Sequence, residues 1–392
     1  MEKIIVSKTT IKALQNGKQL LVESDLNQVA NQLESLANQA VILIDGSGNY
    51  LANAYLSTQN KGVGWVYSTR SESFDLALLI ERFKEARALR QDFFTNEATT
   101  AFCLFNEEGD KLGGIRVELY QQFAVFSWYN TFVYEHRLMI INAFRQVFPE
   151  IIGGYGKNRF KACSIESEHL FGQAEENPVV IKENGINYAT SLNDGLMTGI
   201  FLDQREVRAR LAAGLARGKS LLNLFSYTAA FSVAAASGGA SQTTSVDLAK
   251  RSIDKSLAHF ALNGLDMTNH RLVVMDTFEY FKYAKRKSLR YDVIVIDPPS
   301  FARNKGKVFS VHKNYGDLIA GALNILNDNG IIIASTNAQN LTITAFEKIL
   351  RGALSDVDYR FKSTFRLPRD FRYNVKNPES NYLKVFVIEV KK

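Results

Sequence analysis

The chain has 392 residues, of which 46% are hydrophobic and 22% charged, a balance typical of a globular protein with two or three domains. No stretch approaches the roughly 20 unbroken apolar residues of a membrane span, and the N-terminus lacks a secretory signal pattern, so we expect a cytoplasmic protein without membrane association. The two cysteines, Cys103 and Cys163, have no partners at metal-ligand spacing and predict neither a disulfide framework nor a metal site.

The net charge of +7 is unevenly distributed along the chain. Residues 1–177 hold 17 basic and 21 acidic side chains, whereas residues 178–392 hold 30 and 19. The second part therefore carries a net charge of +11, which favours a polyanion such as RNA as its partner. Lysines scattered over a solvated surface would give the same total, so charge alone does not decide between the two interpretations.

Residues 1–70 predict a small β-rich module. Four short apolar runs, IIVSK, QLLVES, AVILID and GWVYST, have the composition of strands. Asn16-Gly17 and Gly46–Asn49 supply turn signals between these runs. A β-rich module of this size is therefore expected at the start of the chain.

Residues 71–177 predict a second, α+β domain. Apolar residues recur at intervals of three and four over 73–94, which indicates an amphipathic helix with Ser73 as its expected N-cap. A hairpin around 107–114 and a second helix over 135–148 follow. A domain that combines a sheet with helices is therefore expected here.

From residue 178 onward, strands and helices alternate regularly. A hairpin turning at Asn184-Gly185 comes first. The expected strands are 220–226, 243–247, 271–276, 291–299 and 330–336, and the helical stretches between them predict a parallel sheet covered on both faces. Segments 359–367 and 383–390 are expected to add an antiparallel closing pair. The fold class is thus α/β.

Three acidic residues end three of these predicted strands: Asp247, Asp276 and Asp297. Ligands of doubly wound sheets bind beyond the carboxyl ends of the strands, so these residues are candidates for a cofactor site. At its position, Asp247 could accept hydrogen bonds from both hydroxyls of an adenosine ribose. The alternative is that such an aspartate caps the next helix, an interpretation to which Asp276 is more open than Asp247.

The loop after the first of these strands distinguishes between nucleotide cofactors. Its sequence, FSYTAAF, lacks the G-x-G-x-x-G that lets a backbone approach a pyrophosphate, so NAD is disfavoured. S-adenosylmethionine has no phosphate and needs no such loop. The residues expected to contact it here are Phe225, Ser226, Tyr227 and Thr228. Upstream, Phe201, Asp203, Gln204 and Arg205 of GIFLDQREVR are expected to cover it, with Asp203 or Arg205 meeting its charged amino acid end. Alternatively, Arg205, Arg208 and Arg210 form one solvated helical face.

The most specific signal is the segment Asp297-Pro298-Pro299-Ser300-Phe301, which follows the fourth strand. Pro298 and Pro299 lock the chain in an extended form and lack a donor N–H, which leaves carbonyl groups free to face a cleft. Those carbonyls and Asp297 can accept from the N–H groups of a base, while Phe301 offers a stacking surface. Catalytic roles are therefore expected for Asp297, Pro298, Pro299 and Phe301. A purely structural turn, with Phe301 in the core, is the alternative.

Basic residues surround this segment and predict contacts with RNA phosphates. Those expected to bind RNA are Arg303, Lys305, Lys307 and Lys313, together with the aromatic residue Tyr315. Two further basic runs, 282–290 and 366–376, are expected to flank the same cleft. A single run is more often a solvated face, and the prediction depends on all three lying together.

The motifs NLFSYTAAF, SVD, LNGLD, IDPPSF and PES-NYLK resemble those of bacterial 23S rRNA methyltransferases of the RlmI and RlmK type, over nearly the whole length. The resemblance implies a PUA-like RNA-binding module over 1–70, an EEHEE-type domain over 71–177 and a class I, Rossmann-like methyltransferase domain over 178–392. It also implies that the last domain binds S-adenosylmethionine and releases S-adenosylhomocysteine. By this resemblance, the residues on the cofactor side are Phe225, Ser226, Tyr227, Asp247, Asp276 and Asp297. Members commonly have glycine where this chain has Ala229 and Ala230.

The expected target atom follows from a missing cysteine. Relatives that make 5-methylcytosine use a cysteine nucleophile after the fifth strand, where this chain has Ala334-Ser335-Thr336-Asn337. A purine nitrogen needs no covalent adduct, since it attacks the methyl group directly once aligned. We therefore expect methylation of a purine ring or amino nitrogen of 23S rRNA. Cytosine C5 methylation, an RNA-binding protein with an idle methyltransferase domain, and a dehydrogenase are the alternatives, and a homodimer is compatible with the sequence.

Overall fold

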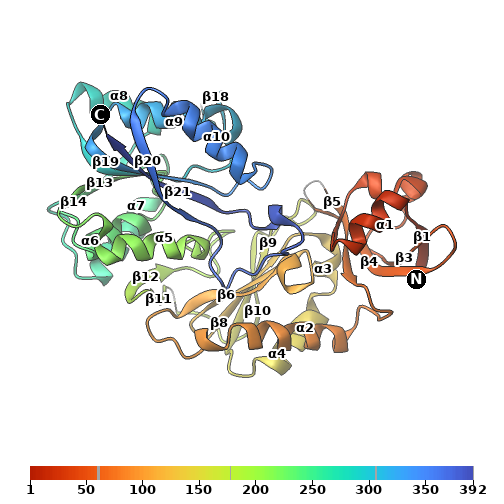
Figure 1. The fold of residues 1–392 in the computed structure, drawn as a ribbon. Helices are drawn as coiled ribbons and strands as arrows, with labels where there is room; N and C mark the ends of the chain where they lie inside the picture. The colour runs from red at the N-terminus through yellow and green to blue at the C-terminus, as the bar shows by residue number, and fades with distance from the viewer. Residues whose placement is uncertain (60–61, 177, 305–306, 392) are drawn as a thin grey trace. The chain divides into compact units, whose positions relative to one another are not determined.

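A computed structural model describes residues 1–59, 62–176, 178–304 and 307–391 (Figure 1). The chain divides into two compact units. Unit 1 consists of Met1–Val179, Ser191–Thr198 and Arg369–Ser380, and unit 2 of Val180–Thr190, Gly199–Pro368 and Asn381–Lys392. Across the described residues, no helix combines the length and the apolar character needed to cross a lipid bilayer.

Unit 1 begins with a five-stranded sheet of order β1-β3-β4-β5-β2. Its elements are β1 (Glu2–Ile5), α1 (Lys8–Gln15), β2 (Leu20–Leu21), β3 (Ala40–Ile44), β4 (Tyr50–Gln59) and β5 (Gly62–Ser68). The four predicted strands are present, but α1 and β4 were not predicted. Ser7 starts α1 by accepting a hydrogen bond from the N–H of Thr10 at 3.1 Å. The sequence of β4, YLANAYLSTQ, does not alternate strictly between apolar and polar residues, because most side chains on both sides of this strand are buried.

The second sheet of unit 1 has the order β10-β9-β8-β7-β6. Its elements are α2 (Leu76–Leu89), β6 (Ala101–Asn106), β7 (Ile115–Tyr120), β8 (Phe123–Trp128), α3 (Thr131–Glu135), α4 (Arg137–Val147), β9 (Gly153–Asn158) and β10 (Ser167–Gly172). The α2 helix begins after Asp75, whose carboxylate accepts from the N–H of Leu78 at 3.0 Å, so the prediction of Ser73 as its cap was wrong. Strand β9, GGYGKN, gave no strand signal because glycine is rare in strands.

The segment 369–380 belongs to unit 1 although it lies near the end of the chain. Asp370 is fully buried, and its carboxylate accepts from the N–H of Cys103 at 2.8 Å. Its carbonyl accepts from Nε of Arg90 at 2.9 Å, and the Arg90 guanidinium also forms a bidentate, buried ion pair with Asp110 at 2.9 and 2.7 Å. Buried polar groups, each with a hydrogen-bond partner, thus attach segment 369–380 to the rest of unit 1.

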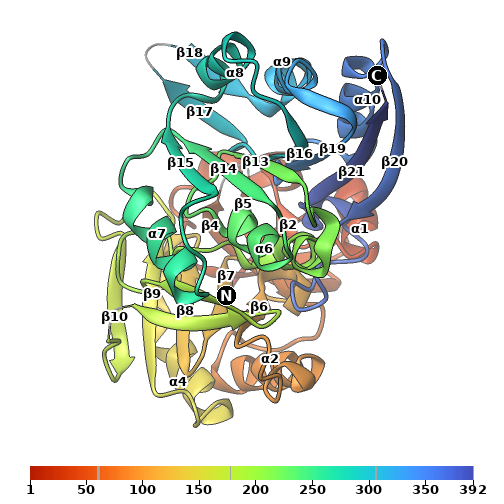
Figure 2. The same cartoon turned by 90° about the vertical axis from the view of Figure 1, so that its left-hand side faces the viewer.

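Unit 2 is built on a seven-stranded sheet of order β15-β14-β13-β16-β19-β21-β20, in which the strands can be followed across Figure 2. The strands are β13 (Ser220–Leu224), β14 (Gln242–Asp247), β15 (His270–Val274), β16 (Tyr291–Ile296), β19 (Leu326–Thr336), β20 (Asp358–Phe365) and β21 (Lys384–Lys391). The first five are mutually parallel, and β21 pairs antiparallel with both β19 and β20. The predicted parallel sheet and its antiparallel closing pair are confirmed.

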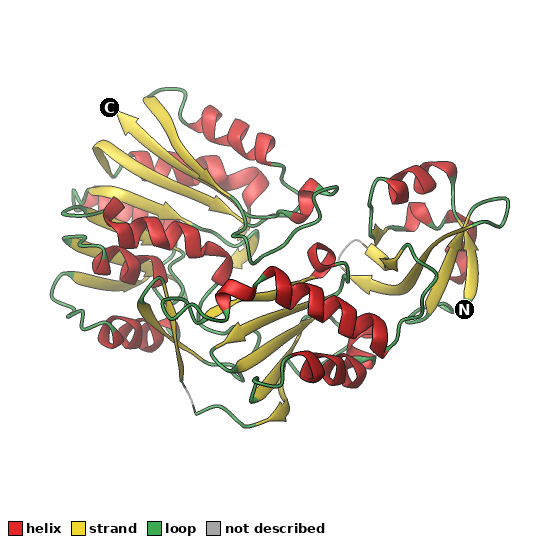
Figure 3. Cartoon of the chain, turned by 60° about the horizontal axis from the view of Figure 1, so that its bottom comes forward, coloured by secondary structure: helices red, strands yellow, loops and turns green. Residues whose placement is uncertain are grey.

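Helices cover both faces of this sheet, as the red helices around the yellow strands of unit 2 show in Figure 3. They are α5 (Arg205–Arg210), α6 (Ala230–Ser237), α7 (Ser252–Leu262), α8 (Thr277–Arg286), α9 (Val311–Leu323) and α10 (Ile343–Ala353). One face packs apolar side chains of β13, β16 and β19 against α8, α9 and α10. The other face packs against α6, which contacts α5 and α7. The near-continuous apolar strands predicted this double cover.

Two hairpins complete unit 2. Strands β11 (Val179–Glu183) and β12 (Ile186–Thr190) turn at Asn184 and Gly185, which have φ angles of 53° and 82°. That left-handed pair is the one an Asn-Gly turn adopts, and the prediction is confirmed. The second hairpin pairs β17 (Phe301–Asn304) with β18 (Lys307–Ser310) and follows the proline pair directly.

Candidate active site

The carboxyl ends of the parallel strands bring the predicted acidic residues to one edge of the sheet of unit 2. Asp247 is the last residue of β14, and both of its carboxylate oxygens accept from the backbone. Oδ2 accepts from the N–H of Tyr227 and Oδ1 from the N–H of Ala249, each at 2.8 Å. The carboxylate thereby holds the loop after β13 beside the loop after β14, where two parallel strands end.

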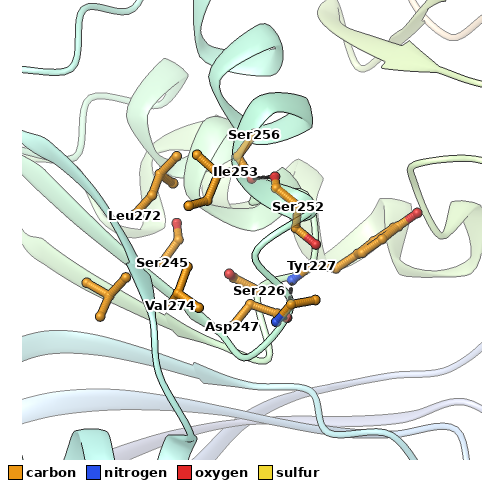
Figure 4. Close-up of a pocket in the computed structure, with 11 residues that line it drawn as sticks. Ser226, Tyr227, Ser245, Asp247, Ser252, Ile253, Ser256, Leu272 and Val274 are labelled. Atoms are coloured by element: carbon orange, nitrogen blue, oxygen red, sulfur yellow. Dashed lines mark hydrogen bonds between the residues drawn. The ribbon is translucent and has the colours of Figure 1, made fainter.

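A hollow opens next to Asp247, and Figure 4 shows the side chains around it. The lining combines hydroxyl groups with aliphatic carbon, which is the surface that a nucleoside with a polar ribose and an apolar ring face requires. The residues are Ser226, Tyr227, Ser245, Asp247, Ala249, Ser252, Ile253, Ser256, Leu272, Val273 and Val274. Three of them, Ser226, Tyr227 and Asp247, are residues that the sequence predicted for the cofactor.

The loop after β13 has an unusual backbone. Phe225, Tyr227 and Ala229 all have positive φ angles, of 56°, 48° and 61°. Thr228 is buried between them, and its hydroxyl donates to the carbonyl of Gly199 at 2.6 Å. A left-handed conformation at a residue with a side chain costs about 1–2 kcal/mol, so three of them in five residues indicate a loop held in place for function.

This backbone predicts an asymmetry between two alanines. Ala229→Gly removes a buried methyl group but also relieves the left-handed strain, so we expect the unfolding free energy to change by less than about 1 kcal/mol. Ala234→Gly, in the interior of α6 and equally buried, should cost about 2 kcal/mol, since it loses both the methyl group and helix propensity. Urea unfolding followed by circular dichroism measures both variants. Equal losses would mean that Ala229 is not strained.

The segment that precedes α5 runs along this loop. The ring of Phe201, 44% exposed, lies 5.7 Å from that of Tyr227. The carboxylate of Asp203, in the turn η5 (Leu202–Gln204), accepts from the hydroxyl of Tyr382 at 2.9 Å. Arg205 is buried at 3% exposure. The structure therefore brings Phe201 to the cofactor loop, whereas Arg205 lies inside the unit.

Arg208 shows that the alternative of a solvated arginine face was wrong. Its guanidinium is buried and forms a bidentate pair with Glu183 at 2.6 and 2.7 Å. The same guanidinium donates to the carbonyl of Phe201 at 2.7 Å. Arg208 thus fixes the backbone beside the candidate site, a role that its position in a charged run did not indicate.

Asp297 lies at the end of β16 in a network of polar side chains. Its Oδ1 accepts from Nε2 of Gln204 at 3.1 Å, and the same nitrogen donates to Oγ of Ser335 at 2.7 Å. Burial raises the pKa of the Asp297 carboxyl from 3.8 to about 6, and the nearby Asp203 carboxylate adds to that effect. Hydrogen bonds from Ser335 and Gln204 and the charge of Arg208 oppose it. Asp297 is therefore mostly ionised at neutral pH and titrates within reach of it.

The prolines behind Asp297 have different surroundings. Pro298 is buried, Pro299 is exposed, and the Phe301 side chain is 54% exposed. The alternative in which Phe301 belongs to the core was therefore wrong. Ser300 donates from its hydroxyl to Oδ1 of Asn337 at 2.8 Å, which ties the segment to the residues after β19. The edge where β16 and β19 end thus presents a carboxylate, an amide and an open aromatic ring.

Asp276 was a candidate for the cofactor, but its carboxylate caps α8. Oδ1 accepts from the N–H groups of Phe278 and Glu279 at 3.0 and 3.3 Å. This is the interpretation left open for an aspartate after a strand. Capping engages Oδ1, and Asp276 does not line the hollow beside Asp247, so it is the weakest of the three strand-end candidates.

Tyr315 was predicted to contact RNA, and the structure contradicts that prediction. The side chain is fully buried on α9, and its hydroxyl lies 2.9 Å from the carbonyls of both Ile296 and Ser335, to which it donates. Apolar residues on either side of it had the spacing of a helix, and position 315 falls on the buried face.

Tyr315 is instead expected to support the strand ends. Tyr315→Phe should lower the unfolding free energy by about 1–2 kcal/mol, because the two carbonyls lose their shared donor. Binding of RNA should be unchanged. Urea unfolding and a filter-binding titration with rRNA measure the two effects, and a loss of RNA affinity without a loss of stability would restore the original prediction.

The predicted basic rim is only partly visible. Lys313 and His312 are exposed at the start of α9, and Phe309 lies with its ring 6.2 Å from that of Phe225. Arg303 and Lys307 lie on β17 and β18, but their side chains, like all of Lys305, lie outside what the structure describes.

The basic run over 282–290 does not flank the site. Helix α8 starts beside the carboxyl end of β15 and returns to the start of β16, where Nη1 of Arg290 donates to the carbonyl of Asn324. Lys285, Arg286 and Lys287 therefore lie at the edge opposite Asp297, so the prediction that they flank the cleft was wrong. The third basic run, 366–376, is divided between the two units. Arg366 donates to the carbonyl of Leu383 within unit 2, and residues 369–376 belong to unit 1.

Strand order, antiparallel last strand and acidic strand ends together define a class I, Rossmann-like methyltransferase fold. The model of the S-adenosylmethionine-dependent methyltransferase family matches residues 156–358, and that of the PUA-like domain matches residues 4–69. The chain belongs to the S-adenosylmethionine-dependent methyltransferases, with an N-terminal PUA-like domain. Its predicted fold class, enzyme class and cofactor are confirmed.

Relatives match the chain over nearly its full length. A Bacillus subtilis (strain 168) protein provisionally named ribosomal RNA large subunit methyltransferase YwbD is 39% identical over 100% of both chains. Ribosomal RNA large subunit methyltransferase I of Yersinia pestis bv. Antiqua (strain Angola) is 28% identical over 91% of this chain and 92% of its own. The crystal structure of SMU.776, provisionally described as a methyltransferase and complexed with SAH, is 51% identical, with a TM-score of 0.95 over 100% of both chains.

Proposed function

We propose that the chain methylates a base of 23S rRNA, at a purine ring or amino nitrogen, without a covalent cysteine intermediate. The single observation that carries the target atom is the absence of cysteine from residues 178–392. Asp297 after β16 and the exposed ring of Phe301 four residues later support it as contacts for the base. The rRNA substrate is supported by the two relatives named as large subunit rRNA methyltransferases. The charge of +11 over 178–392 suits the same polyanion.

S-adenosylmethionine supplies an activated methyl group on its sulfonium. Asp247 accepts from the ribose hydroxyls, as an acidic residue at the end of the second strand does in Rossmann-like sites. The loop from Phe225 to Thr228 lies along the cofactor, and Phe201 covers it. Asp203 contributes negative charge near the cofactor's cationic end, while buried Arg205 supports the segment rather than contacting the cofactor.

The base is held by the residues after β16. The Asp297 carboxylate accepts from an N–H of the base, and carbonyls of the Asp297-Pro298-Pro299 backbone accept from its neighbours. Phe301 stacks against the ring, since more than half of its surface is open. These contacts align the nitrogen and remove its water, which is the contribution the protein makes to a direct transfer.

Covalent activation of a cytosine C5 requires a thiolate that this unit lacks. Cys103 and Cys163 both belong to unit 1. Burial raises the pKa of the Cys103 thiol well above its usual value, so this thiol stays protonated and unreactive. Ser335 stands in the stretch where relatives carry the cysteine, and a hydroxyl is a poor substitute for a thiolate in this addition.

Contacts to RNA phosphates are assigned to Arg303, Lys305, Lys307 and Lys313 around the site, with Tyr315 removed from the set. The PUA-like domain over 1–70 is a second RNA contact. Residues 71–177 are the central domain, and 178–392 are the methyltransferase domain apart from 191–198 and 369–380, which belong to unit 1. Replacing Lys313 with alanine should weaken RNA binding by a similar factor for every sequence and reduce its dependence on salt.

Nucleoside mass spectrometry of 23S rRNA from wild-type and deletion strains tests the proposal. We expect one methylated purine nucleoside to decrease in the deletion strain and to return with the intact gene. A gene carrying Asp297→Ala serves as the matched control and should not restore it. A loss of 5-methylcytidine would instead support C5 chemistry, and an unchanged profile would favour an RNA-binding protein with an idle methyltransferase domain.

A further inference from the structure

His259 is a buried histidine whose two ring nitrogens both face backbone carbonyls. It lies in the last turn of α7, and its side chain has no exposed surface. Nδ1 is 3.0 Å from the carbonyl oxygen of Thr228, and Nε2 is 2.9 Å from that of Ala189. A carbonyl oxygen only accepts hydrogen bonds, so each contact needs a proton on the ring nitrogen. Neutral imidazole carries one such proton and imidazolium carries two, so only the protonated ring satisfies both contacts.

The two carbonyls belong to segments of unit 2 that are far apart in the sequence. Ala189 lies in β12, whereas Thr228 lies in the loop after β13. Thr228 stands between Tyr227 and Ala229, both of which have left-handed backbones. Such a backbone persists only where its surroundings hold it, and a hydrogen bond to the Thr228 carbonyl is one such restraint. The charge state of His259 therefore affects how firmly this loop is held.

Burial and nearby charges decide when the ring gains its second proton. Burial lowers the pKa of His259 below its ordinary value of 6.5, and the charges of Arg208 and Lys255 add to that effect. The carbonyls of Ala189 and Thr228 act in the opposite direction, and so does the C-terminal end of α7, whose partial negative charge favours a cation. The ring is therefore neutral at pH 8 and becomes protonated as the pH falls below 6.5.

The other elements packed against His259 add little net charge. On β12, the ring of Tyr188 meets His259 edge-on, with 5.3 Å between the ring centroids, and burial raises the Tyr188 pKa so that its hydroxyl stays neutral. On β11, Glu183 forms a buried ion pair with Arg208, which offsets the Arg208 charge. Helix α6 contains no ionisable side chain. His259 is therefore the group of this cluster that changes its charge between pH 5 and 8.

We propose that His259 is a positioning residue for cofactor binding, whose imidazolium form donates to the carbonyls of Thr228 and Ala189 together and holds the loop after β13 on β12. The inference rests on the assignment of this loop to the cofactor under the proposed function. A proton on His259 and a bound cofactor favour the same loop conformation, so each increases the affinity of the protein for the other. Cofactor binding therefore tightens as the pH falls, and it draws a proton onto the ring.

Calorimetric titration with S-adenosylhomocysteine at pH 5 and pH 8 tests the proposal. Asp297 titrates in the same range, so all proteins in this experiment also carry Asp297→Asn. With His259 intact, we expect the affinity to be roughly 10-fold higher at pH 5, the effect of gaining one charge-assisted hydrogen bond. His259→Gln can donate at every pH but cannot gain a proton, so its two affinities should agree within about twofold. His259→Asn is a second, smaller neutral replacement with the same expected result.

Proton uptake provides a second measurement on the same proteins. Titrations at pH 6 in two buffers with different ionisation enthalpies count the protons that are bound together with the ligand. We expect uptake of a fraction of one proton with His259 intact and none in His259→Gln. His270→Gln is the matched control, because His270 is a partly buried histidine of the same unit, lies at the amino end of β15 and contacts the hydroxyl of Thr243 rather than the loop. This control should keep both the pH dependence and the proton uptake.

Two results would overturn the role of His259. One is an affinity that is the same at pH 5 and pH 8 with His259 intact, and the other is a pH dependence or proton uptake that persists in His259→Gln. A protein that binds no S-adenosylhomocysteine at either pH would overturn the proposed cofactor site, and this inference with it.

Discussion

Asp247→Ala is expected to weaken the binding of S-adenosylhomocysteine by at least about 100-fold, or about 3 kcal/mol. The carboxylate would lose charge-assisted hydrogen bonds to the ribose hydroxyls, each of which contributes about 1.5–3 kcal/mol. It would also stop holding the N–H groups of Tyr227 and Ala249, both at 2.8 Å, so the loop after β13 would be less well ordered for the ligand. Isothermal titration calorimetry measures the loss directly.

Phe301→Ala is the matched comparison for this experiment. The Phe301 ring is 54% exposed and lies after the proline pair, so its removal should leave both the fold and cofactor affinity intact. The rate constant for methylation of rRNA should fall by about 10-fold or more, the effect of losing one base–aromatic stacking contact. If both variants lost cofactor affinity equally, Phe301 would belong to the cofactor side.

Asp247→Asn separates the two roles of the carboxylate. Asparagine keeps one acceptor oxygen, enough for one of the two backbone N–H groups, and loses the charge, so the loop should remain partly ordered while ribose binding weakens. We expect an affinity between those of the wild type and Asp247→Ala. An affinity as low as that of Asp247→Ala would mean that charge, rather than loop order, dominates.

The parallel sheet could be predicted because its strands carry their own signals. Strands β13, β16 and β19 are apolar on both faces, since helices cover both, and they remain recognisable without alternation. Strand β9 could not be predicted, because its local sequence does not show why glycine is needed there. The need comes from tertiary packing, since a Cβ at Gly154 would lie 2.2 Å from the ring of Phe171. The position of Asp370 in unit 1 depends on contacts with residues more than 250 positions away, which no local pattern contains.

The candidate site divides in a similar way. Asp247 and Asp297 could be predicted because strand ends in a parallel sheet meet at one edge. Tyr315 was assigned to the surface because it stands near basic residues, although the face of a helix, rather than proximity in sequence, decides exposure. Gln204 was predicted only as one of the residues that cover the cofactor, and Arg208 was missed as a site residue, since their side-chain roles depend on partners after β16 and in β11. A buried polar side chain becomes informative only when its partners are known.

Asp297→Asn should have a second large effect, one that depends on pH. Burial raises the pKa of this carboxyl from 3.8 to about 6, and only the ionised form can accept from a base N–H with both oxygens. The wild-type methylation rate should therefore fall about 10-fold per pH unit below pH 6 and level off above pH 7. The variant should be at least about 100-fold slower at pH 8, with no dependence on this ionisation between pH 5 and 8.

The same substitution should stabilise the protein above pH 6. A carboxyl whose pKa is higher in the folded than in the unfolded state favours folding while it is protonated, and that contribution is lost as the pH rises from 3.8 through 6. Relative to Asp297→Asn, the unfolding free energy of the wild type should thus fall over this range. The full pKa difference corresponds to about 3 kcal/mol, and the fall should be smaller than this because the carboxyl keeps some exposure to solvent. Below pH 4 the difference should not depend on pH.

Unfolding in urea followed by circular dichroism measures this change. We expect the difference in unfolding free energy between wild type and Asp297→Asn to depend on pH between pH 4 and 6. A rate profile that is flat through pH 6 in the wild type, with the same stability difference between the two proteins at pH 5 and 8, would place the Asp297 pKa near its ordinary value and remove the carboxylate from the pH-sensitive step.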